Sequence, residues 1–177
     1  MANLIKNRRP AADPWQLLEP AADGGQPVIP PHGDIIVPLV TWLEQRDTLL
    51  SRSGRLGVWL DSDEEPALLG DDLRLFGVVA VNFSQFTDGR GYSIARLLRE
   101  RYGWRGELRA IGDVQRDQLF YLARCGFDAF ALREGEDLQS ALSAFGDFSE
   151  AYQASVERAQ PLFRRRILAS SDGMEWS

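Results

Sequence analysis

Gly77-Val78-Val79-Ala80-Val81-Asn82-Phe83 is the stretch of sequence that decides the fold. Its apolar run is continuous and rich in β-branched residues, which is typical of a parallel strand covered on both faces. A polar, glycine-containing segment follows it, and an apolar helical pattern begins at Ser93. Because a strand followed by a helix is the repeating unit of α/β proteins, this stretch predicts a parallel sheet.

The same alternation of strand and helix continues in both directions along the chain. Short apolar runs at 55–60, 108–111 and 127–132 predict three further strands. Helical patterns are found at 38–50, 66–75, 93–102, 115–124, 136–145 and 148–159. We therefore predict an α/β fold of about four βα units with right-handed crossovers. These units form either a half-barrel or a small doubly wound sheet.

The chain divides into three zones by composition. Residues 1–34 hold six of the nine prolines and are expected to form an irregular N-terminal arm. Within this arm, Trp15-Gln16-Leu17-Leu18 is either a short strand or an anchor on the body, and a β-hairpin along one sheet edge is the alternative for the zone. Residues 35–168 are predicted to form a single α/β domain, and residues 169–177 a polar tail.

Composition excludes several classes of function. The net charge of −6 argues against non-specific nucleic-acid binding, which requires a basic surface. A single cysteine, Cys125, and a single histidine, His32, exclude an intramolecular disulfide and the usual zinc and iron–sulfur ligand sets. We expect Cys125 to be packed and His32 to be exposed. No apolar stretch is long enough to cross a membrane, so we expect a cytoplasmic protein.

The first candidate site is the loop after the central strand, Thr87-Asp88-Gly89-Arg90-Gly91-Tyr92-Ser93. The glycines would let the backbone approach a ligand closely, and Arg90 with the helix N–H groups would receive an anion. The alternative is an ordinary βα turn, in which Asp88 or Ser93 caps the helix and Arg90 pairs with Asp88. The loop lacks the pattern of a nucleotide-binding loop.

The second candidate site follows the next strand. It contains Gly112-Asp113, which is expected to face the first loop and Asn82 at the same sheet edge. Asp117-Gln118 lie one turn further on and either join the site or only decorate the following helix. Asp113 is expected chiefly to cap the following helix, with orientation of Arg90 or general-base catalysis as alternatives. Asp88 and Asp113 are the candidate catalytic residues. Arg109 lies inside its strand and should need a carboxylate at a neighbouring strand end.

Other polar or aromatic features have plainer interpretations. Asp61-Ser62-Asp63-Glu64-Glu65 could bind a divalent cation, but a solvated loop is favoured and we predict no metal site. The run Arg164-Arg165-Arg166 is either a helix end or a docking patch for an acidic partner. Trp15, Trp104 and Trp176 lie outside the clearest apolar faces, which makes one of them a candidate for an interface.

Three stretches carry a resemblance to a known family: residues 86–93, residues 108–114 with Asp117 and Gln118, and residues 125–130. They resemble bacterial proteins of unknown function whose genes often lie beside the sulfite reductase gene and which are labelled as oxidoreductases of sulfite reduction. The resemblance spans residues 30–168. It implies a setting in assimilatory sulfur metabolism, and it brings no catalytic residues.

Two functional hypotheses follow. In the first, the protein is a partner or redox-assisting subunit of a sirohaem sulfite reductase. No cofactor motif is evident, so electron transfer would require a bound flavin or a cofactor on the partner. In the second, it is a small α/β oxidoreductase or anion-binding enzyme, with Arg90 and Arg109 holding an oxyanion and Asp88 or Asp113 acting as acid or base. A homodimer would complete a half-barrel.

Overall fold

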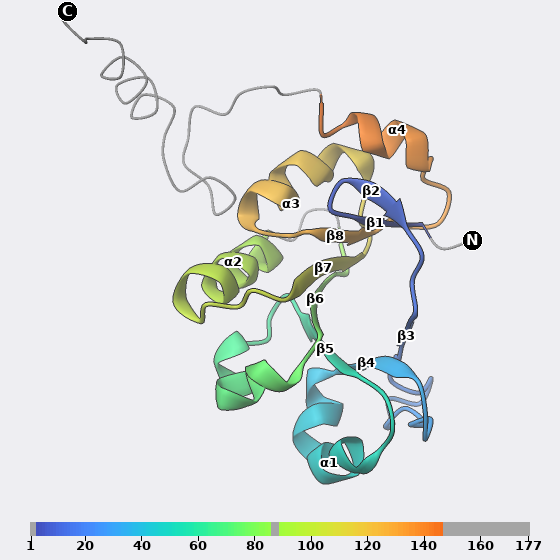
Figure 1. Ribbon diagram of the computed structural model, residues 1–177, viewed down its shortest axis with the longest axis vertical. Helices are drawn as coiled ribbons and strands as arrows, with labels where there is room; N and C mark the ends of the chain where they lie inside the picture. Colours follow the sequence, from blue (N-terminus) through green and yellow to red (C-terminus); the bar gives the residue numbers. More distant parts are fainter. Residues whose placement is uncertain (1–2, 86–88, 147–177) are drawn as a thin grey trace, which may run out of the picture.

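The computed structural model describes residues 3–85 and 89–146. One eight-stranded sheet curls into a half-barrel, with the strand order β2-β1-β8-β7-β6-β5-β4-β3 (Figure 1). Strands β3 to β8 run parallel, whereas β1 is antiparallel to both β2 and β8. The strands are β1 (Leu4–Lys6), β2 (Arg9–Ala11), β3 (Trp15–Leu17), β4 (Asp34–Pro38), β5 (Leu56–Asp61), β6 (Val78–Phe83), β7 (Glu107–Gly112) and β8 (Ala129–Ala131).

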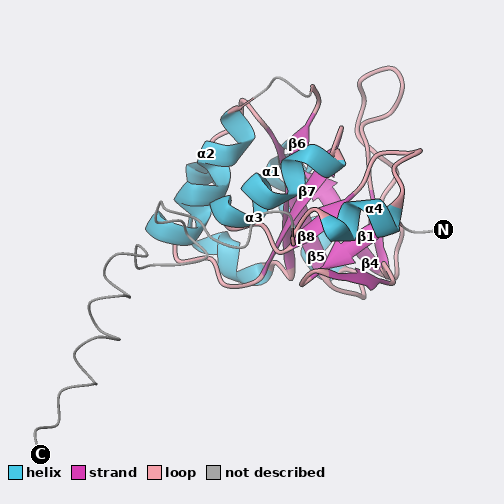
Figure 2. Cartoon of the chain, turned by 90° about the horizontal axis from the view of Figure 1, so that it is seen from above, coloured by secondary structure: helices cyan, strands magenta, loops and turns pink. Residues whose placement is uncertain are grey.

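The helices lie on the convex side of this sheet, and Figure 2 shows α2 and α3 to one side of the strands. This arrangement confirms the half-barrel rather than the doubly wound alternative, which would place helices on both faces. The helices are α1 (Leu39–Ser51), the 3₁₀ helix η1 (Pro66–Leu75), α2 (Arg90–Arg96), the π-helix η2 (Leu97–Arg101), the 3₁₀ helix η3 (Arg116–Gln118), α3 (Leu119–Cys125) and α4 (Leu138–Ser143).

Strand β6 shows how the sheet separates two apolar clusters. Val79, Val81 and Phe83 point to the convex side and join the large core beneath the helices. Val78 and Ala80 point to the concave side and join a smaller cluster. That smaller cluster also contains Trp15, Ile36, Trp59 and Ile111. The continuous apolar run of β6 is therefore explained by burial on both faces.

The four strands predicted from the apolar runs are confirmed as β5, β6, β7 and β8. The sheet is wider than expected because it also contains β4 and three short strands of the N-terminal arm. The prediction of an irregular arm is wrong over these strands, and the stated alternatives are confirmed. β1 and β2 form a hairpin on β8, and β3, which begins at Trp15, pairs with β4. A three-residue strand is too short to show a clear alternation of apolar and polar residues. It becomes structured by pairing with longer strands of the sheet.

The predicted helices are confirmed with changes at their ends and in their type. The helix expected from Ser93 begins at Arg90 and becomes a π-helix, and the one expected from Gln115 begins as the 3₁₀ helix η3. Gly126 ends α3 in the left-handed conformation, with φ of 115°. No helix among the described residues is long and apolar enough to cross a membrane.

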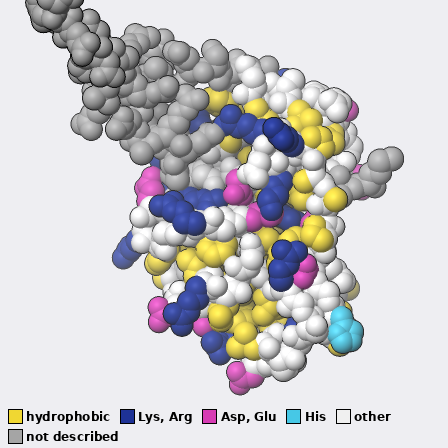
Figure 3. Space-filling model, in the orientation of Figure 1, with side chains coloured by type: hydrophobic (Ala, Val, Ile, Leu, Met, Phe, Trp, Pro, Cys, Tyr) yellow, Lys and Arg dark blue, Asp and Glu magenta, His cyan; other side chains and the backbone are white. Residues whose placement is uncertain are grey.

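Several predictions concern aromatic, cysteine and C-terminal residues. Trp15 and Trp104 are both buried within the fold. Cys125 is buried and His32 is exposed (cyan in Figure 3), as predicted. The predicted helix at 148–159, the Arg164–Arg166 run, Trp176 and the polar tail lie outside the described residues.

Candidate functional site

The carboxyl ends of β5, β6 and β7 form an edge with polar side chains. Asp61 lies opposite Asn82 in the β5–β6 register, and the Nδ2 atom of Asn82 donates a 2.7 Å hydrogen bond to Oδ1 of Asp61. The Asp61 N–H donates to the Glu64 carboxylate at 2.7 Å. Burial raises the pKa of Glu64, and the charges of Asp61 and Asp63 add to this effect. The acidic loop therefore folds back on the end of β5.

Gly112 makes the tight turn at the end of β7. Its φ is +90°, and a Cβ atom there would lie 2.5 Å from both Oδ1 of Asn82 and the carbonyl oxygen of Phe83. The next residue, Asp113, donates its N–H to that carbonyl at 2.7 Å. Only glycine fits both the backbone conformation and the close contact. Gly112 and Asn82 are therefore brought together, as the sequence predicts.

The Asp113 side chain contacts Arg133 and Gln115. Its Oδ1 atom accepts from Nη1 of Arg133 at 3.2 Å, and both carboxylate oxygens lie 3.2 Å from Nε2 of Gln115. Arg133 also donates from Nε to Glu136 at 3.0 Å. The expectation that Asp113 caps the helix is wrong, because Gln115 is the N-cap residue. Asp113 instead belongs to a charged cluster with Arg133 and Glu136.

The helix cap is a reciprocal pair of glutamines. The Gln115 N–H donates to Oε1 of Gln118 at 3.0 Å, and the Gln115 side chain accepts from the N–H of Gln118. Gln118 is buried, and its Nε2 lies 3.4 Å from the Tyr92 hydroxyl on α2. Asp117 is 81% exposed, and among the described residues it pairs with its neighbour Arg116, at 3.6 Å. Gln118 therefore joins the two candidate loops, whereas Asp117 points to solvent.

The first candidate loop is described from Gly89 onward. Gly89 is the N-cap of α2, and Arg90 is exposed at its first position. Gly91 is buried against Phe83, whose ring atoms would lie 2.7 Å from a Cβ atom at this position. Asp88, and with it the expected Asp88–Arg90 pair, lies outside the described residues. Gly91 therefore serves the packing of α2 on β6.

Arg109 lies on the concave face rather than at the carboxyl edge. Its Nε and Nη2 atoms are both 2.8 Å from Oε1 of Glu107, and its Nη1 atom is 2.8 Å from Oδ2 of Asp13. Lys6 pairs with the other Glu107 oxygen at 2.7 Å. A carboxylate partner for Arg109 is confirmed, but its expected place at a neighbouring strand end is wrong. Glu107 and Arg109 share a face because they are two residues apart in one strand.

A cavity of 250 Å³ opens at the carboxyl edge on the concave side. It is lined by Leu17, Glu19, Pro20, Trp59, Asn82, Ile111 and Gly112. Asn82 and Gly112 are the two predicted site residues that line it. Among the described residues no group of three or more His, Cys, Asp or Glu side chains is placed to bind a metal ion. The cavity is a small mixed pocket with one acidic side chain, Glu19.

The fold and this edge define an α/β half-barrel protein whose polar residues gather where the parallel strands end. A family model described as "Bacterial protein of unknown function (DUF934)" matches residues 57–163, which is well over half of the chain. The chain belongs to this DUF934 family. A comparison with curated proteins finds none that matches. The matched range begins in β5 and includes both candidate loops.

Proposed function

We propose that the protein is a cytoplasmic accessory protein of assimilatory sulfite reduction. It acts as a partner or redox-assisting subunit of a sirohaem sulfite reductase. The resemblance of residues 30–168 to proteins encoded beside the sulfite reductase gene suggests this setting. The observation that supports a docking role is the carboxyl edge, where the polar side chains are hydrogen-bonded to one another in the free protein.

The Asp113–Arg133 pair is a partly exposed ion pair at this edge. The Asp113 and Arg133 side chains are 31% and 46% exposed, and Gln115 and Glu136 hold them from either side. A charged surface that is already ordered loses little side-chain entropy when a partner docks. Its alternating charges also favour one orientation of the partner over others. This cluster is therefore the contact surface that we assign to the reductase.

The alternative function is a small α/β oxidoreductase or anion-binding enzyme. The 250 Å³ cavity beside Asn82 and Gly112 is the observation that favours it. Neither Arg90 nor Arg109 lines this cavity, and the Arg109 guanidinium is already held by Glu107 and Asp13. A bound flavin would supply electron transfer in the redox-assisting form of the first function or in an oxidoreductase.

Co-purification with the sulfite reductase tests the proposal. We expect the wild-type protein to be retained by immobilised reductase, and Asp113→Ala to be retained much less. Asp72→Ala is a matched control, because Asp72 also pairs with an arginine, Arg46, and its side chain is 29% exposed on the helical side of the molecule. Failure of the wild-type protein to bind, or equal retention of both variants, would contradict the assignment.

The absorbance spectrum of the purified protein separates the two forms of the proposal. A colourless protein that binds the reductase supports a purely structural partner. Flavin bands between about 350 and 500 nm would support the redox-assisting form, since bound flavins carry out such electron transfer. Flavin bands in a protein that does not bind the reductase would favour the enzyme alternative.

A further inference from the structure

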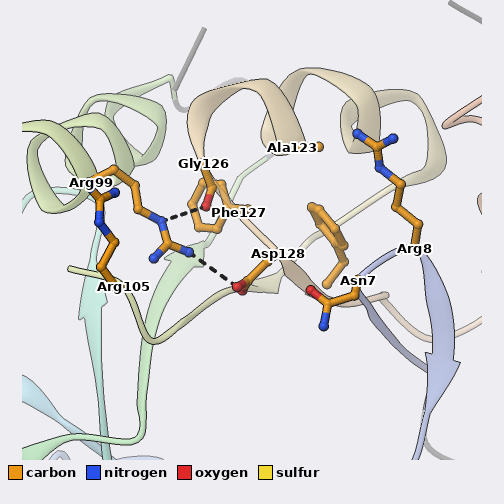
Figure 4. A pocket seen from close by; sticks show the side chains of 9 residues that line it. Asn7, Arg8, Arg99, Arg105, Ala123, Gly126, Phe127 and Asp128 are labelled. Carbon is orange, nitrogen blue, oxygen red and sulfur yellow. Dashed lines mark hydrogen bonds and ion pairs between the residues drawn. The ribbon is translucent and has the colours of Figure 1, made fainter. Parts of the chain in front are cut away.

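Two pockets lie at the amino-terminal edge of the parallel strands, and their arginines differ in how their charge is balanced. The first pocket has a volume of 470 Å³ and contains Arg99, whose side chain is drawn in Figure 4. The Nη2 atom of Arg99 lies 3.4 Å from the Asp128 carboxylate, and its other nitrogens donate to three backbone carbonyls. The charge of Arg99 is therefore paired within the fold.

The second pocket, of 400 Å³, lies between the carboxyl ends of α1 and η1, beside the start of β5 and β6. This volume is within the range of pockets that hold small organic ligands. Leu50 at the end of α1 and Leu75 at the end of η1 line it and are 43% and 40% exposed. Arg52 and Arg55 also line it, and none of its described lining residues is acidic. The pocket thus combines an accessible apolar wall with a cationic one.

The Arg52 guanidinium donates to uncharged backbone groups. Its Nε atom donates to the Pro30 carbonyl at 3.0 Å, and its Nη2 atom to the Gly33 carbonyl at 2.6 Å. The Nη2 bond lies at the surface, so the second N–H of Nη2 is open to a ligand. The Nη1 atom is buried and has no hydrogen-bond partner among the described residues. Because a buried N–H without an acceptor costs free energy, Arg52 differs from Arg99 in lacking an anionic partner.

One carboxylate, that of Asp34, faces the two arginines of this pocket. It accepts from the Nε and Nη2 atoms of Arg55 at 3.0 and 2.6 Å, and from the Arg55 backbone N–H at 2.8 Å. Hydrogen bonds from Arg55 lower the pKa of Asp34, and the charge of Arg52 contributes in the same direction. The carboxyl end of α1 carries about half a negative charge, which offsets only part of the second arginine charge. The pocket therefore keeps a net positive charge.

We propose that this pocket binds an aliphatic carboxylate of medium chain length, with the carboxylate against Arg52 and the chain along Leu50 and Leu75. One carboxylate matches the one arginine charge that Asp34 leaves unpaired, and the guanidinium geometry suits a carboxylate. The chain is held by burial of the exposed apolar surface of the two leucines. The site lies at the opposite end of the parallel strands from Asp113, so it is separate from the proposed docking surface.

Titration with hexanoate tests this site, with binding followed by the amide NMR signals of Gly54 and Gly77, which line the pocket. We expect hexanoate to bind. Acetate has the charge without the chain, and 1-hexanol has the chain without the charge, so each should bind at least about tenfold more weakly. The proposal is overturned if hexanoate does not bind at about 10 mM, or if 1-hexanol binds as tightly as hexanoate.

Leu75→Ser and Leu68→Ser are a matched pair of variants for the apolar wall. Both leucines are exposed on η1, by 40% and 56%, but only Leu75 lines the pocket. We expect Leu75→Ser to weaken the binding of hexanoate about fivefold, because an apolar contact is lost, and Leu68→Ser to stay within about twofold of wild type. Equal affinities of these two variants would overturn the proposal.

Arg52→Gln tests the partner of the carboxylate. We expect this variant to lose the preference for hexanoate over 1-hexanol, since the charge that distinguishes the two ligands is removed. Arg105→Gln is the control, because Arg105 is exposed at the first pocket, and it should keep the preference. Circular dichroism checks that Arg52→Gln folds, and the leucine pair tests the site independently if it does not. A preference that survives in folded Arg52→Gln contradicts the proposed site.

Discussion

The Nη1 atom of Arg109 lies 2.8 Å from the Oδ2 atom of Asp13, although 96 residues separate them in the chain. Asp13 is in the segment that runs from β2 to β3 across the open side of the half-barrel (Figure 1). Arg109 is 3% exposed on β7, in the middle of the sheet. This ion pair therefore fastens the N-terminal arm across the concave face.

Asp13→Ala should lower the free energy of unfolding by about 1–3 kcal/mol, because a buried guanidinium loses one of its two carboxylates. Urea denaturation measures the change. Asp47→Ala is the control, since Asp47 is fully exposed and 4.0 Å from Arg46, and it should change stability by less than about 0.5 kcal/mol. Equal effects of the two substitutions would contradict the fastening role of Asp13.

Gly112→Ala should be strongly destabilising, by about 2–4 kcal/mol, because a positive φ and a steric clash act together. Gly103 provides a matched comparison. Its φ is +67°, but no atom lies within 4 Å of the place that a Cβ would take. Gly103→Ala should cost only about 1 kcal/mol, the backbone part of the effect. Thermal denaturation of both variants gives the difference, and a Gly112 variant as stable as the Gly103 variant would disprove the contact with Asn82.

Asp128 and Asp72 should titrate on opposite sides of the ordinary value of 3.8. Burial raises the pKa of Asp128, against the opposing effects of the Leu108 N–H and Arg99. The folded state then holds this proton more tightly, so the contribution of Asp128 to stability falls as pH rises from 3.8 through its raised pKa. A hydrogen bond from Arg46 lowers the pKa of Asp72, whose contribution is lost as pH falls through that lowered value.

NMR titration of the two carboxyl carbons measures both pKa values in one experiment. The expected order is Asp72 first and Asp128 last as the pH is raised. Asp128 titrating at or below 3.8 would contradict this prediction, because its carboxyl would then be better solvated than the structure indicates.

The central strands were predictable because burial on both faces leaves a continuous apolar run, as in Val78–Val81. For β1, β2 and β3 the sequence offers a hairpin and a short strand only as alternatives to an irregular arm, because each strand is three residues long and is ordered by pairing with another strand. The register of Leu4 with Ala131 joins opposite ends of the described chain. Such contacts leave no local periodicity from which they could be read.

The sequence predicts where the candidate site lies, but not which of its side chains contact one another. Asn82 and Gly112 meet at one sheet edge because parallel strands end there together. The partner of Arg109 was missed because Asp13 is far away in sequence, although the Glu107–Arg109 spacing already indicates one shared strand face. The position of Asp113 after Gly112 predicts a helix cap there, whereas the spacing of Gln115 and Gln118 is the signal of the reciprocal cap that forms.

The affinity of the purified protein for sulfite reductase tests the central claim most directly. Arg133 and Arg46 are a matched pair of arginines, with side chains 46% and 44% exposed and each paired with an aspartate. We predict that Arg133→Glu weakens the binding of the reductase by at least about tenfold, whereas Arg46→Glu stays within about twofold of wild type. Absence of wild-type binding, or equal affinities of the two variants, would contradict the assignment of the carboxyl edge as the docking surface.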